Sequence, residues 1–171
     1  MNKNILITGP PGSGKTTLIE KVVSRTGLPV TGFLTREIRE RGVRVGFFIE
    51  TFDGKQEILA HIGFESPFRV GRYGVRVETL EALAVPSLCA KAENILVVID
   101  EIGKMECLSP TFKRAVLAVF DSLNPVLASV AEKGDAFTKS IKARNDVIIS
   151  NITRVDRERL IVSIANELRG N

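Results

Sequence analysis

The stretch that decides the fold is Gly9-Pro10-Pro11-Gly12-Ser13-Gly14-Lys15-Thr16-Thr17. It matches the pattern G-x-x-x-x-G-K-[ST], a glycine-rich loop that binds phosphate groups. A short apolar run at residues 4–8 precedes the loop and predicts a buried strand. Apolar residues then recur at helical spacing from Leu18 to Val23, which predicts a helix directly after the loop. Strand, loop and helix in this order are the context that the pattern requires.

The residue types of the loop suit a triphosphate. Its glycines let the backbone bend so that several N–H groups point at one anion, and the N-terminus of the following helix adds partial positive charge. We therefore expect all nine residues to contact a nucleotide. Lys15 is expected to reach the β and γ phosphates and to act in catalysis, and the Thr16 hydroxyl is expected to bind Mg²⁺.

Length and composition predict one globular domain over residues 1–171. The chain is 44% hydrophobic and 26% charged, and no apolar run approaches the ~18 residues of a membrane span. The first strand begins almost at the first residue, and there are two cysteines, so we expect a cytoplasmic protein. The net charge of +4 is mild, and the lysine and arginine residues are scattered along the chain. A nucleic-acid partner is therefore possible, but the charge does not by itself argue for one. We expect a monomer.

The pattern changes after the first helix, which should end near residues 26–27. Two strands at 31–38 and 43–51 and a third at 56–62 are separated by turn residues. They predict an antiparallel meander, inserted over about residues 30–62. Its arginines Arg36, Arg39 and Arg44 are interpreted first as a solvated face. The alternative is that one of them reaches the nucleotide.

Strands and helices alternate over the rest of the chain, after a surface loop at 63–74. This pattern predicts an α/β fold with a mostly parallel central sheet. A helix at 78–93 should be kinked or split by Pro86. The remaining elements are expected to be a strand at 95–99, a helix beginning at Ser109-Pro110, a strand at 126–130, a helix at 135–144, a strand at 147–150 and a helix at 154–169.

A second motif follows the apolar strand at 95–99, which ends in Asp100 and Glu101. Ligands of open α/β sheets bind beyond the carboxyl ends of the strands, so Asp100 is expected to hold Mg²⁺. The alternative is a pair of solvated turn acids. A carboxylate directly after the metal aspartate can accept a proton from an attacking water, and we assign this general-base role to Glu101.

The two motifs together resemble a known family. The run Asp100-Glu101-Ile102-Gly103-Lys104-Met105-Glu106 is similar to that of the small P-loop nucleoside-triphosphatases first described from thermophiles, relatives of the human cancer-related nucleoside-triphosphatase. Further similar segments are residues 32–39, 44–47, 69–75, Arg144 with Asp146, and 151–153. The resemblance implies a RecA-like three-layer fold and Mg²⁺-dependent hydrolysis of ATP, GTP and other triphosphates to diphosphate and phosphate. Cys107 departs from the family pattern, in which a larger apolar residue is expected. This difference concerns side-chain packing only.

Five further residues are weaker candidates. Gly103 and Lys104 lie on the predicted nucleotide side of the sheet and are candidates for binding the nucleotide. Lys104 could contact the phosphates, or it can equally be an exposed, unpaired lysine. Arg144 precedes the last strand and is a candidate for acting on the γ phosphate. Its alternative is charge pairing near a helix C-terminus. Asn151 and Thr153 follow the last strand and are candidates for the base pocket.

Two other functions stay open at this point. A nucleotide or small-molecule kinase uses the same phosphate loop, and it would transfer the phosphoryl group to an acceptor. A nucleotide-switched binding protein would use slow hydrolysis only as a timer. Phosphate release in the absence of an acceptor would distinguish a hydrolase from a kinase. A partner protein that binds this chain only in the presence of a non-hydrolysable triphosphate would favour the nucleotide-switched binding protein.

Overall fold

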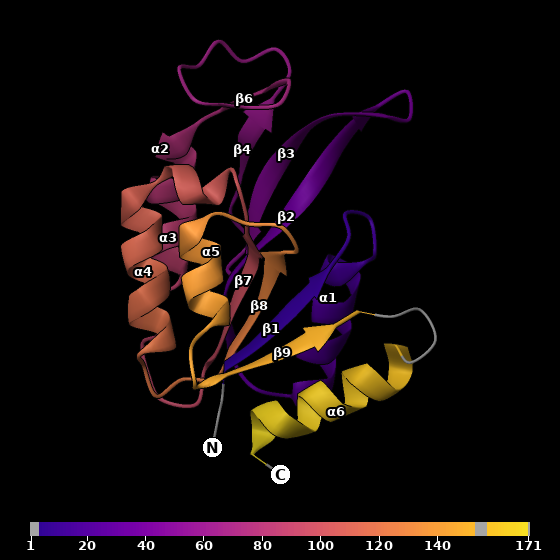
Figure 1. Cartoon of the computed structure of the whole chain (residues 1–171), viewed down its shortest axis with the longest axis vertical. Coiled ribbons are helices and arrows are strands. Elements are labelled where there is room, and N and C mark those ends of the chain that lie inside the picture. The colour runs from indigo at the N-terminus through magenta and orange to yellow at the C-terminus, as the bar shows by residue number, and fades with distance from the viewer. Residues whose placement is uncertain (1–3, 153–156, 171) are drawn as a thin grey trace.

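One mixed β-sheet runs through the protein (Figure 1). The computed structural model describes residues 4–152 and 157–170, and within them nine strands pair in the order β5-β6-β4-β3-β2-β7-β8-β1-β9. Their bounds are β1 (Asn4–Gly9), β2 (Val30–Glu40), β3 (Val43–Thr51), β4 (Gln56–His61), β5 (Arg69–Val70), β6 (Tyr73–Val75), β7 (Leu96–Ile102), β8 (Val126–Ala131) and β9 (Val147–Asn151). The neighbours β2-β7-β8-β1-β9 are parallel, and the pairs on the other side of β2 are antiparallel.

Helices cover both faces of the parallel strands (Figure 1). The helical segments are α1 (Lys15–Thr26), α2 (Val77–Thr79), a π-helical turn (Leu80–Ala84), α3 (Val85–Ser87), a 3₁₀ turn (Glu106–Leu108), α4 (Pro110–Phe120), α5 (Ala136–Lys142) and α6 (Arg157–Arg169). On β1, Leu6 joins the core cluster of α4 and α5, whereas Ile5 and Ile7 join that of α1 and α6. Successive residues of a strand point to opposite faces of the sheet, so the side chains of β1 enter two separate cores. The protein therefore has three layers, with the sheet between two layers of helices.

Local signals in the sequence give the observed helix ends. Helix α1 ends at Gly27, which has φ 65°, as a left-handed cap that favours glycine. Helix α4 begins with Pro110, and the Ser109 Oγ accepts a hydrogen bond of 3.0 Å from the Phe112 backbone N–H. Both predicted boundaries are confirmed. The last predicted helix appears as α6 from Arg157, and its expected start at 154–156 lies outside the described residues.

The inserted meander differs from its prediction at both ends. Residues Val30–Phe33 pair in parallel with Leu96–Ile99, so the first half of β2 belongs to the parallel sheet. The same strand continues to Glu40 and turns back antiparallel as β3. The loop expected at 63–74 contains β5 and most of β6, which extend the antiparallel part to Val75. The meander is therefore an extension of the central sheet that starts within a shared strand.

The helix predicted at 78–93 is shorter than expected. Its hydrogen-bonding pattern changes to a π-helical turn at Leu80–Ala84, and regular helix ends at Ser87. Pro86 has no N–H to bond back to the preceding turn, which is consistent with the predicted interruption. Within the part of the chain that the structure describes, no helix is long and apolar enough to cross a membrane.

Candidate active site

The glycine loop connects β1 to α1 at the carboxyl edge of the parallel strands. Gly9 is the last residue of β1, and Gly14 is the N-cap of α1 with φ 87° and ψ 32°. This left-handed conformation is costly for any residue with a Cβ. The loop therefore leads into the helix with its N-terminal N–H groups facing the space beyond the sheet, which is the arrangement that binds anions.

Lys15 lies across the mouth of this loop. Its Nζ donates hydrogen bonds to the carbonyl oxygens of Gly9 (3.0 Å) and Pro10 (3.3 Å). The same nitrogen lies 3.9 Å from Glu101 Oε2, and only 10% of the Lys15 side chain is exposed. A largely buried ammonium is thus held between the phosphate loop and the end of β7.

Asp100 is fixed at the end of β7 by hydroxyl groups from three other elements. Its Oδ2 accepts a hydrogen bond of 2.6 Å from Thr16 on α1, and its Oδ1 accepts one from Ser129 on β8. The Thr35 hydroxyl donates to its backbone carbonyl at 2.5 Å. Asp100 is 2% exposed, and this burial raises its pKa, while the hydrogen bonds from Ser129 and Thr16 act in the opposite direction. The two sequence motifs therefore meet in space.

Glu101 points toward Lys15 and stays partly open to solvent. Its side chain is 36% exposed. Burial of the rest raises the pKa of its carboxyl, Lys15 lowers it, and the negative charge of Asp100 raises it further. The raised pKa makes this carboxylate a stronger base than an exposed glutamate.

Gly103 and Glu106, which follow Glu101 in the sequence, lie beside its carboxyl group. A Cβ on Gly103 would lie 2.6 Å from Glu101 Oε1 and 3.1 Å from Glu106 Oε2, so a larger residue there would require these carboxyl groups to shift. The Gly103 N–H donates to Glu106 Oε2 at 3.2 Å. Glu106 is buried, and this burial, with the charge of Glu101 next in effect, raises its pKa to about 8. Glu106 was not predicted as a site residue, although Asp100, Glu101 and Glu106 place three acids within seven residues.

Lys104 and Asn151 lie at the same edge of the sheet as the loop. Lys104 is exposed and lines a pocket of about 180 Å³ together with Asp135 and Thr138. Asn151 is exposed and pairs in register with Thr8, one residue before the loop. Thr153 lies outside the described residues. Cys107 is buried in the core, where burial raises its thiol pKa to about 12, so the departure from the family pattern is a matter of packing.

Arg144 is not brought to the loop, which argues against its predicted action on the γ phosphate. Its guanidinium forms ion pairs of 2.7 Å with Asp121 and with Asp146, and Asn4 at the start of β1 also donates to Asp146. The loop follows the other end of β1, five residues or about 17 Å of strand away. A residue that precedes a parallel strand lies at the amino edge of the sheet, opposite the ligand edge.

The arginines of the meander are also paired with carboxylates. Arg36 forms ion pairs with Glu20 on α1 (2.7 Å) and Glu50 on β3 (2.8 Å). Arg39 and Arg44 both pair with Glu37. These pairs are consistent with the first interpretation, a solvated and charge-balanced face.

Arg157 does reach the loop, and sequence analysis missed it. As the first residue of α6, it donates from Nη2 to the Ser13 carbonyl oxygen at 2.5 Å. Its guanidinium atoms lie 3.0–3.4 Å from the point where a Cβ on Gly14 would be. A cation in the first turn of a helix opposes the helix dipole, so its position in the sequence was a signal that it has another partner.

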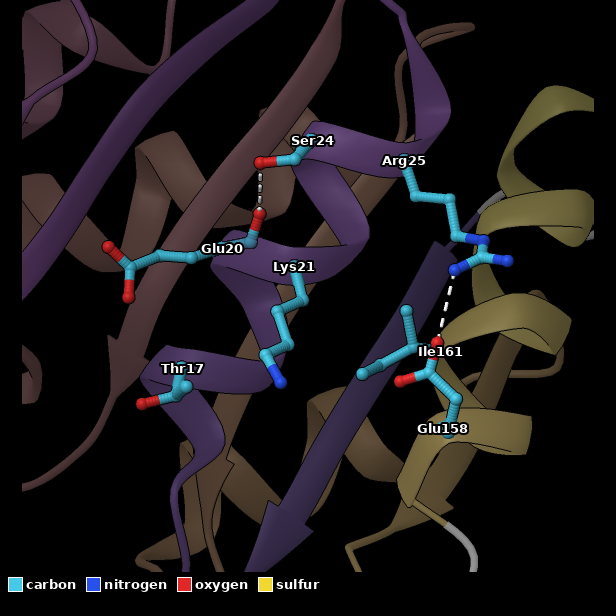
Figure 2. Close-up of a pocket in the computed structure, with 7 residues that line it drawn as sticks. All are labelled: Thr17, Glu20, Lys21, Ser24, Arg25, Glu158 and Ile161. Atoms are coloured by element: carbon cyan, nitrogen blue, oxygen red, sulfur yellow. Dashed lines mark hydrogen bonds and ion pairs between the residues drawn. The ribbon is translucent and has the colours of Figure 1, made fainter.

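Helices α1 and α6 enclose an open groove beside the loop (Figure 2). Its volume is about 520 Å³. It is lined by Thr17, Glu20, Lys21, Ser24, Arg25, Glu158 and Ile161. Arg25 Nη1 lies 3.1 Å from Glu158 Oε1 and links the two helices across it. Four of its lining residues, Glu20, Lys21, Arg25 and Glu158, are charged, and Thr17 connects the groove to the phosphate loop.

Residues 4–165 match the model of a protein family described as NTPase. The chain belongs to this family. It is 47% identical over 168 residues to the nucleoside-triphosphatase THEP1 of Thermotoga sp. strain RQ2, an alignment that covers 98% of this chain and 96% of the relative. It is 38% identical to the human cancer-related nucleoside-triphosphatase, covering 96% of this chain and 95% of that protein.

Solved structures of NTPase family members have the same fold. The crystal structure of THEP1 from Aquifex aeolicus superposes with a TM-score of 0.88 at 35% identity, covering 96% of this chain and 98% of that one. The solution structure of the human cancer-related nucleoside triphosphatase gives a TM-score of 0.83 at 36% identity, covering 98% of each chain. The predicted α/β P-loop NTPase fold and the family resemblance are both confirmed.

Proposed function

We propose that this protein hydrolyses nucleoside triphosphates to diphosphate and phosphate, with Mg²⁺ as its cofactor and broad preference for the base. The observation that carries the proposal is the position of Glu101, whose carboxylate lies 3.9 Å from Lys15 beside the paired Thr16 and Asp100. A phosphate loop, a pair of oxygen groups suited to a metal ion and a carboxylate base would then be available to one γ phosphate.

The loop residues Gly9–Thr17 would bind the phosphates through backbone N–H groups at the N-terminus of α1. Lys15 would leave its contacts with the Gly9 and Pro10 carbonyls, or share them, to bind the β and γ oxygens as a point charge. The protein thereby supplies positive potential where the leaving diphosphate gains negative charge.

The Thr16 hydroxyl and the Asp100 carboxylate fit Mg²⁺, which prefers oxygen ligands and keeps several waters. They already contact each other at 2.6 Å, and Ser129 holds the other carboxylate oxygen. Bound Mg²⁺ would supply charge neutralisation between the β and γ phosphates. A buried carboxylate whose pKa is raised in the protein alone is suited to a dication, because the cation favours the ionised form.

Glu101 would orient a water in line with the γ phosphorus and accept its proton. The water oxygen forms the new bond to phosphorus, the bond from phosphorus to the β–γ bridging oxygen breaks, and the bridging oxygen keeps the electron pair. The partly exposed carboxylate leaves access for water. Lys15 beside it favours the ionised, proton-accepting form.

The phosphates are common to all nucleoside triphosphates, and the residues assigned to them are backbone groups and charges. Asn151 is the described side chain that we assign to the base side, and Lys104 is an outer phosphate contact. Gly103 is assigned to the nucleotide side with Lys104, and its lack of a side chain also leaves room for the Glu101 carboxyl group. We further propose that the protein works as a monomer on free nucleotides in the cytoplasm, which is consistent with its two unpaired cysteines, Cys89 and Cys107.

A phosphate-release assay tests this function. ATP, GTP, CTP and UTP are each incubated with the protein, with Mg²⁺ or with a chelator, in the absence of any acceptor. Mg²⁺-dependent release of phosphate from all four is expected. Release from none of them, combined with phosphoryl transfer to added nucleosides or nucleoside monophosphates, would replace the proposal with a kinase.

A further inference from the structure

Arg157 brings a cation to the phosphate loop from the last helix of the chain. It lies 144 positions after Ser13, whose carbonyl oxygen accepts its hydrogen bond of 2.5 Å. The flat guanidinium packs over Gly14, where the nearest atoms are 3.0, 3.1 and 3.4 Å from an added Cβ. The contact depends on the packing of α6 against α1, where Ile161 and Ile164 share a core with Leu18 and Val22.

The charge of Arg157 is available to an anion. The arginines that sequence analysis considered, Arg36, Arg39, Arg44 and Arg144, all form ion pairs with carboxylates. Among residues 4–152 and 157–170, no carboxylate forms an ion pair with Arg157. The hydrogen bond to the Ser13 carbonyl does not neutralise the guanidinium, so among the described residues its positive charge has no carboxylate partner.

Lys15 and Arg157 bind carbonyl oxygens at opposite ends of the loop. Lys15 binds the carbonyls of Gly9 and Pro10 at the start of the loop, beside Glu101. Arg157 binds at Ser13 and Gly14, where α1 begins. If the γ phosphate lies next to Glu101, the end at Arg157 receives the part of the nucleotide that hydrolysis leaves unchanged.

We propose that Arg157 is a nucleotide-binding residue that contacts the non-transferred phosphates and holds triphosphate and diphosphate alike. This inference rests on the proposed function, because it takes Glu101 to mark the γ-phosphate side. Arg157 contributes to binding in the ground state and in the transition state equally. Its loss should therefore raise KM and leave kcat nearly unchanged.

The test compares Arg157→Gln and Arg157→Lys with the parent chain. Glutamine keeps a donor for the Ser13 carbonyl but removes the charge, whereas lysine keeps a charge. Affinity for ATP and for ADP is measured with Mg²⁺ by isothermal titration calorimetry at low and high ionic strength, together with kcat and KM. Arg169→Gln is the matched control, because Arg169 is an exposed residue in the last turn of the same helix.

Arg157→Gln should raise the Kd for ATP and ADP by the same factor, about tenfold. Its affinity should depend less steeply on salt than that of the parent, since one cationic contact is missing. Arg157→Lys should recover part of the loss, and Arg169→Gln should match the parent. If Arg157→Gln is unstable, the Arg157→Lys variant and the salt dependence give the same comparison.

Two results would overturn the inference. An unchanged Kd for both nucleotides in Arg157→Gln would make the residue a structural clamp of the loop. A lower kcat with unchanged ADP affinity would place it on the γ phosphate instead. Neither result resembles failure of the proposed function itself, in which the parent chain would bind or hydrolyse no nucleotide.

Discussion

The Thr16 hydroxyl donates a hydrogen bond of 2.6 Å to Asp100 Oδ2 and so joins the start of α1 to the end of β7. The two residues are 84 positions apart, and each belongs to a separate motif. Ser129 donates to the other carboxylate oxygen, which fixes the rotation of the Asp100 side chain. A hydroxyl and a carboxylate held in this way present two hard oxygen atoms to one side, before any cation binds.

Asp100→Asn should increase the Mg²⁺ concentration needed for half-maximal hydrolysis. The amide keeps the shape of the side chain and can still bind Thr16 or Ser129, but it lacks the negative charge that attracts a dication. The measurement is a Mg²⁺ titration of phosphate release. Asp121→Asn is the matched control, since Asp121 pairs with Arg144 at the opposite edge of the sheet. Identical titrations for Asp100→Asn and the parent would remove Asp100 from the metal site.

Lys15→Ala should weaken binding of ATP and nearly abolish turnover. The ammonium is positioned to bind the phosphates in the ground state and to neutralise the charge that develops on the leaving diphosphate. Binding by calorimetry and phosphate release are measured on the same preparation. Lys21→Ala serves as the control, because Lys21 is an exposed lysine on the same helix, in the groove of Figure 2. Hydrolysis at the parent rate by Lys15→Ala would contradict the phosphate-site assignment.

Gly32→Ala should lower the free energy of unfolding by more than about 2 kcal/mol. Gly32 has φ +107°, and a Cβ there would lie 2.0 Å from the Val98 carbonyl oxygen in the paired strand β7. Gly54 has a similar φ of +88° with nothing near its Cβ position, so Gly54→Ala should cost only about 1 kcal/mol of backbone strain. Urea denaturation of both variants separates the steric clash from the strain. Equal losses would show that β2 moves to admit the methyl group.

Glu106→Gln should make stability less dependent on pH. The folded-state pKa of Glu106 is about 8, raised from 4.5 by burial and then by the negative charge of Glu101. Between these pH values the folded chain holds a proton that the unfolded chain has lost, so stability is greatest at low pH and falls as the pH rises toward 8. The variant should gain on the parent between pH 5 and pH 8 by on the order of 3 kcal/mol. Parallel stability curves for the two chains, measured by urea denaturation, would contradict this.

The parts of the site that sequence analysis predicted are those defined by local context. Gly9–Thr17 lies between a strand and a helix, and Asp100 ends an apolar strand, so nearby residues establish their position. The same rule, that ligands bind at the carboxyl edge of a parallel sheet, argues against Arg144, which precedes its strand. Closeness in sequence to the last strand is therefore not closeness to the ligand.

Arg157 and Glu106 were missed because their roles depend on tertiary packing. The contact of Arg157 with Ser13 requires α6 to lie along α1, which helical periodicity in α6 does not specify. Glu106 is the last residue of the run that begins at Asp100 and starts a short 3₁₀ turn, and its burial depends on the hydrophobic cluster that surrounds that turn. Similarly, β5 and β6 are too short for strand propensity to detect, and they form because Tyr73 and Val75 are buried beside β4.

Glu101→Gln tests whether this carboxylate makes the protein a hydrolase. Glutamine keeps the size of the side chain and one hydrogen-bonding oxygen, but it cannot accept the proton of the attacking water. Affinity for ATP with Mg²⁺ should therefore stay near that of the parent, while the single-turnover rate falls by roughly 10²–10⁴-fold. Both quantities are measured on one preparation. Glu93→Gln, at an exposed glutamate before β7, is the control and should match the parent in both.

Other results with Glu101→Gln would assign the residue differently. Weakened binding with the parent rate at saturation would make Glu101 a binding or metal residue, since its charge would then act before the chemical step. Full activity would remove it from the mechanism and favour a kinase, whose base belongs to an acceptor, or a switch whose hydrolysis is only a timer. Retained affinity with a slow rate is expected only if the Glu101 carboxylate, which lies 3.9 Å from Lys15, takes the proton as the γ phosphate is transferred to water.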